Sequence, residues 1–328
     1  MMLQNLKKRT AFTMIELVFV IIVMGIIGKF GVEFVAQAYR SFIHTTVSNK
    51  LQSSSASAVE FIATRLQHRI KASTIAREID GAINPQFTLL ADYFNQTAPI
   101  IEWIGVDIDG FRGNTQPLWS GIIDLNDTVS NNTGFLSPAT ETNSTDALIE
   151  ALSSSAVVEN DMAIYFVDPD ALPTADNWGW DANTTHFDIQ SNVNIHPIRG
   201  IAGGDPRVLL PITSNPAIGN NFSNVKAFEY YQLAWSAYAV GIDDFNATGN
   251  ETGTLTLWYN YQPWKGDTYL FQADGTDTNS SIIMENVSSF RFIASDSVVK
   301  IQVCVKSLII DGDNDDGGYS ICKEKTVF

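Results

Sequence analysis

Apolar residues form two different patterns along the first part of the chain. From Phe12 to Ile27 they make a nearly unbroken run, which only Glu16 interrupts with a charge. Beyond that run they recur every three or four residues, as on one face of an amphipathic helix. We therefore predict one helix from Thr13 to Ala76, with its first half in lipid or a filament and its second half under a head. The recurring residues are Tyr39, Ile43, Val47, Leu51, Ile62, Leu66 and Ile70, with Ala58 and Val59 filling the gap between Leu51 and Ile62.

Two glycines, Gly28 and Gly31, interrupt the predicted helix. Each costs about 1 kcal/mol relative to alanine in a helix. They either weaken a segment that melts during assembly or let another helix pack closely, and the pattern alone does not choose.

The rest of the chain, from about Asn84, alternates short apolar runs with turn-forming residues. This pattern predicts an antiparallel sheet. Two segments, Asp80–Asn160 and Pro169–Ser223, look irregular and are expected to be large loops or a subdomain, since they contain Trp103, Trp119, Trp178 and Trp180. The predicted strands are Met162–Val167, Tyr230–Val240, Thr254–Tyr261, Thr268–Gln272, Ile282–Ala294 and Val298–Ile309.

Charge gives the orientation of the predicted membrane segment. A basic cluster, Lys7, Lys8 and Arg9, precedes the apolar run. Basic residues favour the cytoplasmic side, so the head should be exported. The net charge of −16 lies in the body of the chain, which argues against nucleic acid as a partner.

Glu16 is the most informative residue of the apolar run. A carboxylate in a membrane segment costs roughly 2.5–3.5 kcal/mol and suggests a function. Its simplest partner is a free α-amino group on a related chain, which requires cleavage between Ala11 and Phe12. A secretory signal peptide or an ordinary anchor fits less well, because the run continues without a small-residue cleavage site and neither explains the carboxylate.

The stretch FTMIELVFVIIVMGII, from Phe12 to Ile27, resembles the class III signal of type IV pilins and type II secretion pseudopilins. The resemblance implies cleavage after Ala11 by a prepilin peptidase, N-methylation of Phe12, and alignment of subunits by Glu16. Ala11 replaces the usual glycine, so we expect slower processing. Fainter similarities at residues 52–70 and 285–307 favour a minor pilin of the PilW or pseudopilin-J kind.

The resulting prediction is an α+β protein in which a long N-terminal transmembrane and amphipathic helix packs on an antiparallel β-sheet head with large loop insertions. Its expected partners are the prepilin peptidase/N-methyltransferase, other pilin or pseudopilin subunits, an inner-membrane assembly platform and the lipid bilayer. It would start in the bacterial inner membrane with a periplasmic head and move into a pilus or pseudopilus. The expected segments are a leader (1–11), a filament-core helix (12–32), an amphipathic helix (33–76) and the head (77–328).

Catalytic motifs are absent from the sequence: the four histidines, His44, His68, His186 and His196, have no metal or nucleophile spacing. We therefore expect a non-catalytic subunit that needs no cofactor. A tip adhesin is the alternative; exposed Trp178 and Trp180 would favour it, whereas burial of both would indicate core packing.

Cys304 and Cys322 are the two cysteines of the chain. In an oxidising periplasm they should form a disulfide worth about 3 kcal/mol. Between them lies an acidic loop whose spacing suits Ca²⁺, although it departs from an EF-hand, and a solvated turn is the alternative. The calcium ligands would be Asp311, Asp313, Asp315 and Asp316.

Ten Asn-x-Ser/Thr triplets suggest glycosylation of exposed loops. Five of them have an acidic residue two positions upstream, a longer motif that resembles the acceptor sequon of bacterial N-linked oligosaccharyltransferases. An Asn/Thr-rich head could also produce such motifs by chance. The five asparagines are Asn126, Asn143, Asn183, Asn246 and Asn279.

Overall fold

The protein is described by a computed structural model with two compact units, residues 1–50 and 51–328. The part of the long helix from Leu51 onward belongs to the same unit as the sheets. The structure describes residues 13–77, 87–89, 100–153, 161–167, 195–200, 203–212, 219–223, 225–249, 251–272, 275–295, 298–307 and 320–328.

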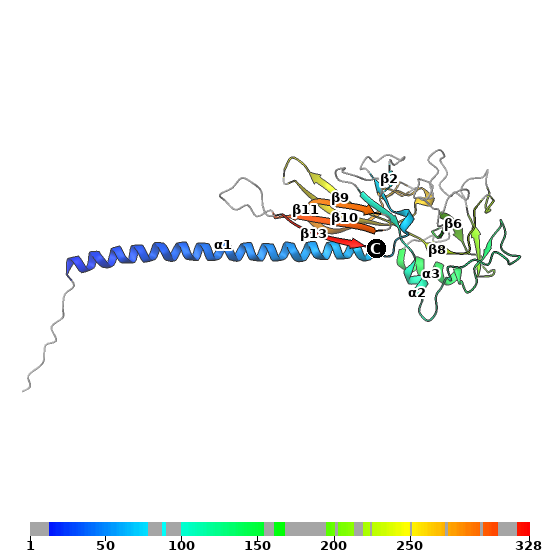
Figure 1. Ribbon diagram of the computed structural model, residues 1–328, viewed down its shortest axis with the longest axis horizontal. Coiled ribbons are helices and arrows are strands. Elements are labelled where there is room, and N and C mark those ends of the chain that lie inside the picture. The colour runs from blue at the N-terminus through cyan, green and yellow to red at the C-terminus, as the bar shows by residue number, and fades with distance from the viewer. Residues whose placement is uncertain are drawn as a thin grey trace, which may run out of the picture. The chain divides into compact units, whose positions relative to one another are not determined.

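The predicted long helix is present as α1, Met14–Leu66, and it continues through Gly28 and Gly31 (Figure 1). It ends earlier than the predicted Ala76. Beyond it the backbone turns, because the N–H of Ile70 donates to the carbonyl of Ile104 at 2.9 Å and the N–H of Val106 donates to that of His68 at 2.9 Å. Pairing with a distant strand thus ends the helix, without a local proline or glycine signal.

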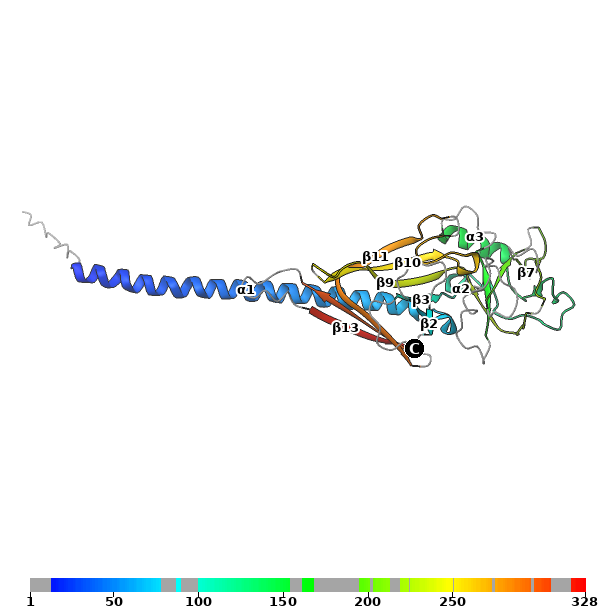
Figure 2. The same ribbon diagram turned by 90° about the horizontal axis from the view of Figure 1, so that it is seen from above.

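An eight-stranded antiparallel sheet forms the larger layer of the head, in the order β13-β12-β11-β10-β9-β3-β1-β2. β9, β10 and β11 run side by side in both views (Figures 1 and 2). The strands are β1 Ile75–Arg77, β2 Phe87–Leu89, β3 Ile100–Ile104, β9 Ala237–Asn246, β10 Thr252–Tyr261, β11 Asn279–Ser295, β12 Val298–Lys306 and β13 Ser320–Val327.

A second sheet of five strands has the order β4-β7-β6-β5-β8. Three of its strands lie within the two segments expected to be large loops or a subdomain, and all five belong to the same compact unit as the larger sheet. Its strands are β4 Phe135–Leu136, β5 Ala163–Phe166, β6 Ile195–Arg199, β7 Val208–Pro211 and β8 Tyr231–Ala234, and the helical elements of the head are η1 Lys71–Ser73, α2 Ile108–Arg112, α3 Thr142–Ser153 and η4 Pro263–Lys265.

Four of the six predicted strands correspond to β5, β10, β11 and β12, and Tyr230–Val240 divides into β8 and β9. The strand prediction for Thr268–Gln272 is wrong. There Thr268 closes a turn: its hydroxyl donates to the carbonyl of Phe271 at 3.0 Å and accepts from the N–H of Phe271 at 3.0 Å. Local side-chain bonds of this kind compete with a strand ladder.

The C-terminal turns of α1 form the centre of the first hydrophobic core. Ala58, Val59, Ile62, Ala63 and Leu66 are buried against residues of the eight-stranded sheet (Figures 1 and 2). The predicted amphipathic stripe is confirmed at Ile62 and Leu66. A cross-strand disulfide joins Cys304 in β12 to Cys322 in β13, as predicted.

We expect Ile62→Ala to lower the free energy of unfolding by about 2–5 kcal/mol, because it leaves a cavity in this core. Phe61→Ala is the control: this larger neighbour is 36% exposed and stacks with Arg65, so about 1 kcal/mol or less should be lost. Guanidinium unfolding of the full-length protein in detergent, followed by tryptophan fluorescence, measures both. Equal losses would contradict the assigned packing.

Candidate functional site on the N-terminal helix

Thr13 and Glu16 form a capping box at the start of α1. The backbone N–H and the hydroxyl of Thr13 donate to Oε2 of Glu16 at 3.0 and 2.9 Å. The N–H of Glu16 in turn approaches Thr13 Oγ1 at 3.4 Å. Such reciprocal bonds satisfy backbone donors that have no partner within the helix. Sequence reasoning overlooked this role, although Thr-x-x-Glu before an apolar run is its signature.

Glu16 and the other acidic residue of this region have different surroundings. Glu33 lies in an exposed ion pair with Lys29, at 3.8 Å one turn away. Within the described part of the chain, the carboxylate of Glu16 accepts hydrogen bonds from Thr13 and forms no ion pair with a basic side chain. Among the described residues, the carboxylate of Glu16 therefore has no counter-charge, whereas that of Glu33 has one.

The apolar side chains of this half of α1 are exposed on every side of the helix. Six consecutive residues, 17–22, are all apolar, and this run is longer than one helical turn. α1 is the described helix that is long and apolar enough to cross a membrane. The exposed large side chains are Met14, Ile15, Leu17, Val18, Phe19, Val20, Ile21, Ile22, Met24, Ile26, Ile27, Phe30, Val32, Phe34, Val35, Tyr39 and Phe42.

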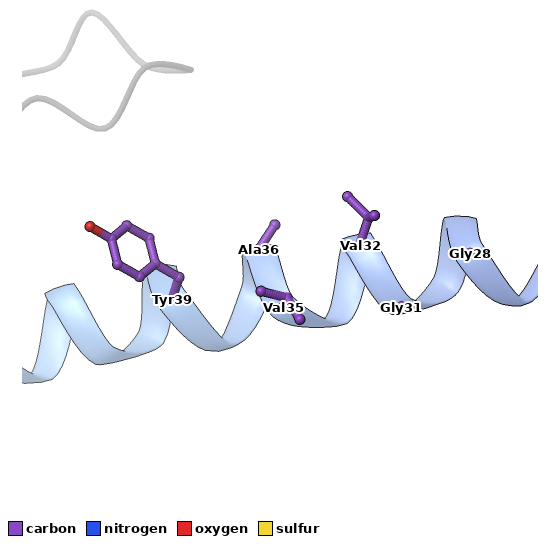
Figure 3. A pocket seen from close by; sticks show the side chains of 6 residues that line it. All are labelled: Gly28, Gly31, Val32, Val35, Ala36 and Tyr39. Atoms are coloured by element: carbon purple, nitrogen blue, oxygen red, sulfur yellow. The ribbon is translucent and has the colours of Figure 1, made fainter.

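Small residues produce an open hollow on one face of this helix (Figure 3). Gly28 and Gly31 contribute no side chain, and no atom lies within 4 Å of the position that a Cβ would occupy at either glycine. Both glycines lie within α1. Small residues let backbones approach closely in membranes. The hollow is lined by Gly28, Gly31, Val32, Val35, Ala36 and Tyr39.

Comparisons with protein-family models, curated proteins and solved structures found no match. The surface of this half of α1 has three features of its own. They are an exposed apolar exterior, the Glu16 carboxylate near its start, which has no ion-pair partner among the described residues, and the hollow at Gly28 and Gly31.

Several predicted site residues lie outside the described residues. These are Ala11 and Phe12 at the expected cleavage site, the four aspartates of the expected calcium loop (Asp311, Asp313, Asp315 and Asp316), and Asn183, Trp178, Trp180 and His186. Among the described residues, no group of three or more His, Cys, Asp or Glu side chains could hold a metal ion. The calcium site stays a prediction.

A buried ion pair is the most notable charged group within the head. Arg77 Nη1 lies 2.9 Å from Glu102 Oε2, and the hydroxyl of Tyr261 donates to Glu102 Oε1 at 2.7 Å. Burial raises the pKa of Glu102, and the charge of Arg77 opposes this shift. Glu102 and Tyr261 have no exposed surface, so a substrate cannot reach this carboxylate. The group is therefore best explained as a structural link between β1, β3 and β10.

We expect Arg77→Met to lower the free energy of unfolding by about 3–5 kcal/mol, because Glu102 would remain buried without its cation. Combining it with Glu102→Gln should recover part of that loss, since the charge is then removed as well. Chemical unfolding of the three variants gives this double-mutant cycle. Additive losses from the two substitutions would contradict a coupled pair.

Proposed function

We propose that this chain is a minor pilin or pseudopilin, a structural subunit that assembles into a type IV pilus or type II secretion pseudopilus through α1. The observation that carries the proposal is the exposed apolar surface of Met14–Phe42 with one carboxylate, Glu16, near its start. In water this surface would be unfavourable, so lipid or other helices must cover it.

Lipid and a helical filament core both cover such a surface. Transfer from lipid to protein gains little hydrophobic free energy, so helix packing has to supply the attraction. The hollow at Gly28 and Gly31 gives a neighbouring helix room to approach. In this proposal the bilayer holds the subunit before assembly, and neighbouring α1 helices replace the lipid afterwards.

In this proposal Glu16 determines how neighbouring subunits align. A carboxylate inside an apolar bundle is costly until an opposite charge reaches it. Cleavage between Ala11 and Phe12 would create an α-amino group on each subunit. The amine of one subunit and Glu16 of its neighbour would then set the axial register between them.

The head is consistent with export. The basic residues before the apolar run favour a cytoplasmic N-terminus, and the Cys304–Cys322 disulfide suits an oxidising compartment. Periplasmic exposure of the head and the roles of the peptidase and assembly platform are parts of the proposal.

No described feature favours the tip-adhesin alternative. Trp103 and Trp119 are buried and serve packing, whereas Trp178 and Trp180, on which the alternative depends, lie outside the described residues.

We expect Glu16→Gln to leave cleavage and membrane insertion intact but to reduce the protein in purified filaments about tenfold or more. Glutamine still serves a capping box, so this substitution removes the charge while preserving the cap. Glu16→Ala should have the same effect on assembly. Immunoblots of membrane and filament fractions from the native host measure the distribution.

Glu33→Gln is the matched control, because it removes another exposed carboxylate from the same helix and should leave incorporation unchanged. Normal incorporation of Glu16→Gln would show that Glu16 acts only as a helix cap, and the register role would have to be abandoned.

We also expect the native protein to begin at N-methylated Phe12. Mass spectrometry of the N-terminal peptide tests this directly. An N-terminus at Met1 or Met2 would leave Glu16 without an amine partner and would contradict the pilin pathway.

A further inference from the structure

The structure distinguishes among the asparagine sequons further than the sequence does, which separates them only by an acidic residue two positions upstream. Transfer of a glycan requires an exposed asparagine and access to the hydroxyl residue two positions later. Four of the five sequons with an upstream acid are described: those at Asn126, Asn143, Asn246 and Asn279.

Three of these four lie in a helix or strand: Asn143 in α3, Asn279 at the start of β11 and Asn246 at the end of β9. The first two keep their asparagine and hydroxyl residue apart. Asn143 lies in the first turn of α3, where Thr145 is 1% exposed and its hydroxyl donates to the carbonyl of Glu141. Asn279 begins β11 and pairs with Tyr259. In an extended strand, residues two positions apart are about 7 Å apart, which separates Asn279 from Ser281. Neither site presents its amide and hydroxyl together.

Asn126 is exposed in a turn, but the side chain that accepts a hydrogen bond within that turn is Asp124. The backbone N–H of Asn126 donates to Oδ1 of Asp124 at 3.0 Å. Within the described residues, no hydrogen bond joins Asn126 to Thr128.

Asn246 is the last residue of β9 and pairs with Thr252, and it combines the required features where the chain turns toward β10. Asn246 and Thr248 are both exposed. Oδ1 of Asn246 accepts from the N–H and hydroxyl of Thr248, at 3.3 and 3.4 Å, and from the N–H of Gly249 at 2.9 Å. These donors hold the carboxamide oxygen toward the turn, and Nδ2 donates no hydrogen bond to another described residue. Asp244 supplies the upstream acid.

Asn131 provides an internal comparison. Its Oδ1 also accepts from the N–H and hydroxyl of the residue two positions later, Thr133, at 2.8 and 2.6 Å. However, its Nδ2 donates to the carbonyl of Thr128 at 3.3 Å, and Val129 occupies the position of the upstream acid. The turn geometry is shared, but the amide nitrogen is engaged and the acid is missing.

We propose that Asn246 is an N-glycan acceptor displayed at the β9–β10 turn. The co-reactant is a polyprenyl-diphosphate-linked sugar, used by a membrane oligosaccharyltransferase on the exported side. Nδ2 forms a bond to the anomeric carbon, and the bond from that carbon to the diphosphate oxygen breaks. Polyprenyl diphosphate leaves with the electron pair, and the amide proton passes to a base of the transferase.

The hydrogen bonds at Asn246 support this step in two ways. The donors from Thr248 and Gly249 stabilise negative charge that develops on Oδ1 as Nδ2 loses its proton. They also hold the acceptor in a turn before it is bound, which reduces the entropy lost on binding. The inference requires export of the head but does not depend on filament assembly.

Glycopeptide mass spectrometry on the full-length protein from its own cells tests the proposal. The peptide containing Asn246 should carry added sugar mass, and fragmentation that retains the glycan should place it on Asn246 rather than on the neighbouring sequon at Asn250. Asn246→Gln and Thr248→Ala should each remove one glycan from the intact mass, whereas Thr248→Ser should retain it.

Asn131→Gln is the matched control and should leave the intact mass changed only by the substitution itself. Equal thermal unfolding of all variants would show that lost modification does not reflect misfolding. A bare Asn246 peptide in the native protein, or glycans confined to Asn131, Asn143 or Asn279, would overturn the proposal.

Discussion

Packing of the C-terminal turns of α1 against the eight-stranded sheet is the interaction on which the head depends. Ile62, Ala63 and Leu66 have no exposed surface and contribute to the same core as Trp103 and Val303. This packing gives the sheet its second layer, since a sheet with one apolar face must bury that face.

One helix thus has two kinds of surface, and the sequence reveals the difference. Where apolar residues form a stripe, the head covers them; where they surround the helix, a single chain does not. The long strands β10, β11 and β12 were also predictable, because alternation over many residues is a strong signal. The turn at Asn246 and the capping box at Thr13 have sequence signatures too, but their hydrogen bonds came from the structure.

The features that the sequence did not predict depend on distant partners. β3 contains Glu102 in the middle of an apolar run. Arg77 in β1 and Tyr261 in β10 bind its carboxylate, and these bonds offset the cost of burying the charge. β13 looks too polar for a strand, with Lys323 and Lys325, but it pairs along its whole length with β12. The end of α1 is likewise determined by pairing near Ile104. No local pattern could have indicated these partners.

β13 has a consequence for the order in which the chain can fold. Its Val327 completes the core that α1 begins, and its Lys325 forms an ion pair with Glu60, 265 positions earlier. Contacts between such distant residues form slowly, and they require the whole chain to be present. The part of the core beside β13 can therefore form only once residues 320–327 have been made, whereas Val240 in β9 and Leu255 in β10 are available to α1 earlier. The edge strand is thus a late addition, which joins a sheet whose earlier strands can already cover the apolar stripe of α1.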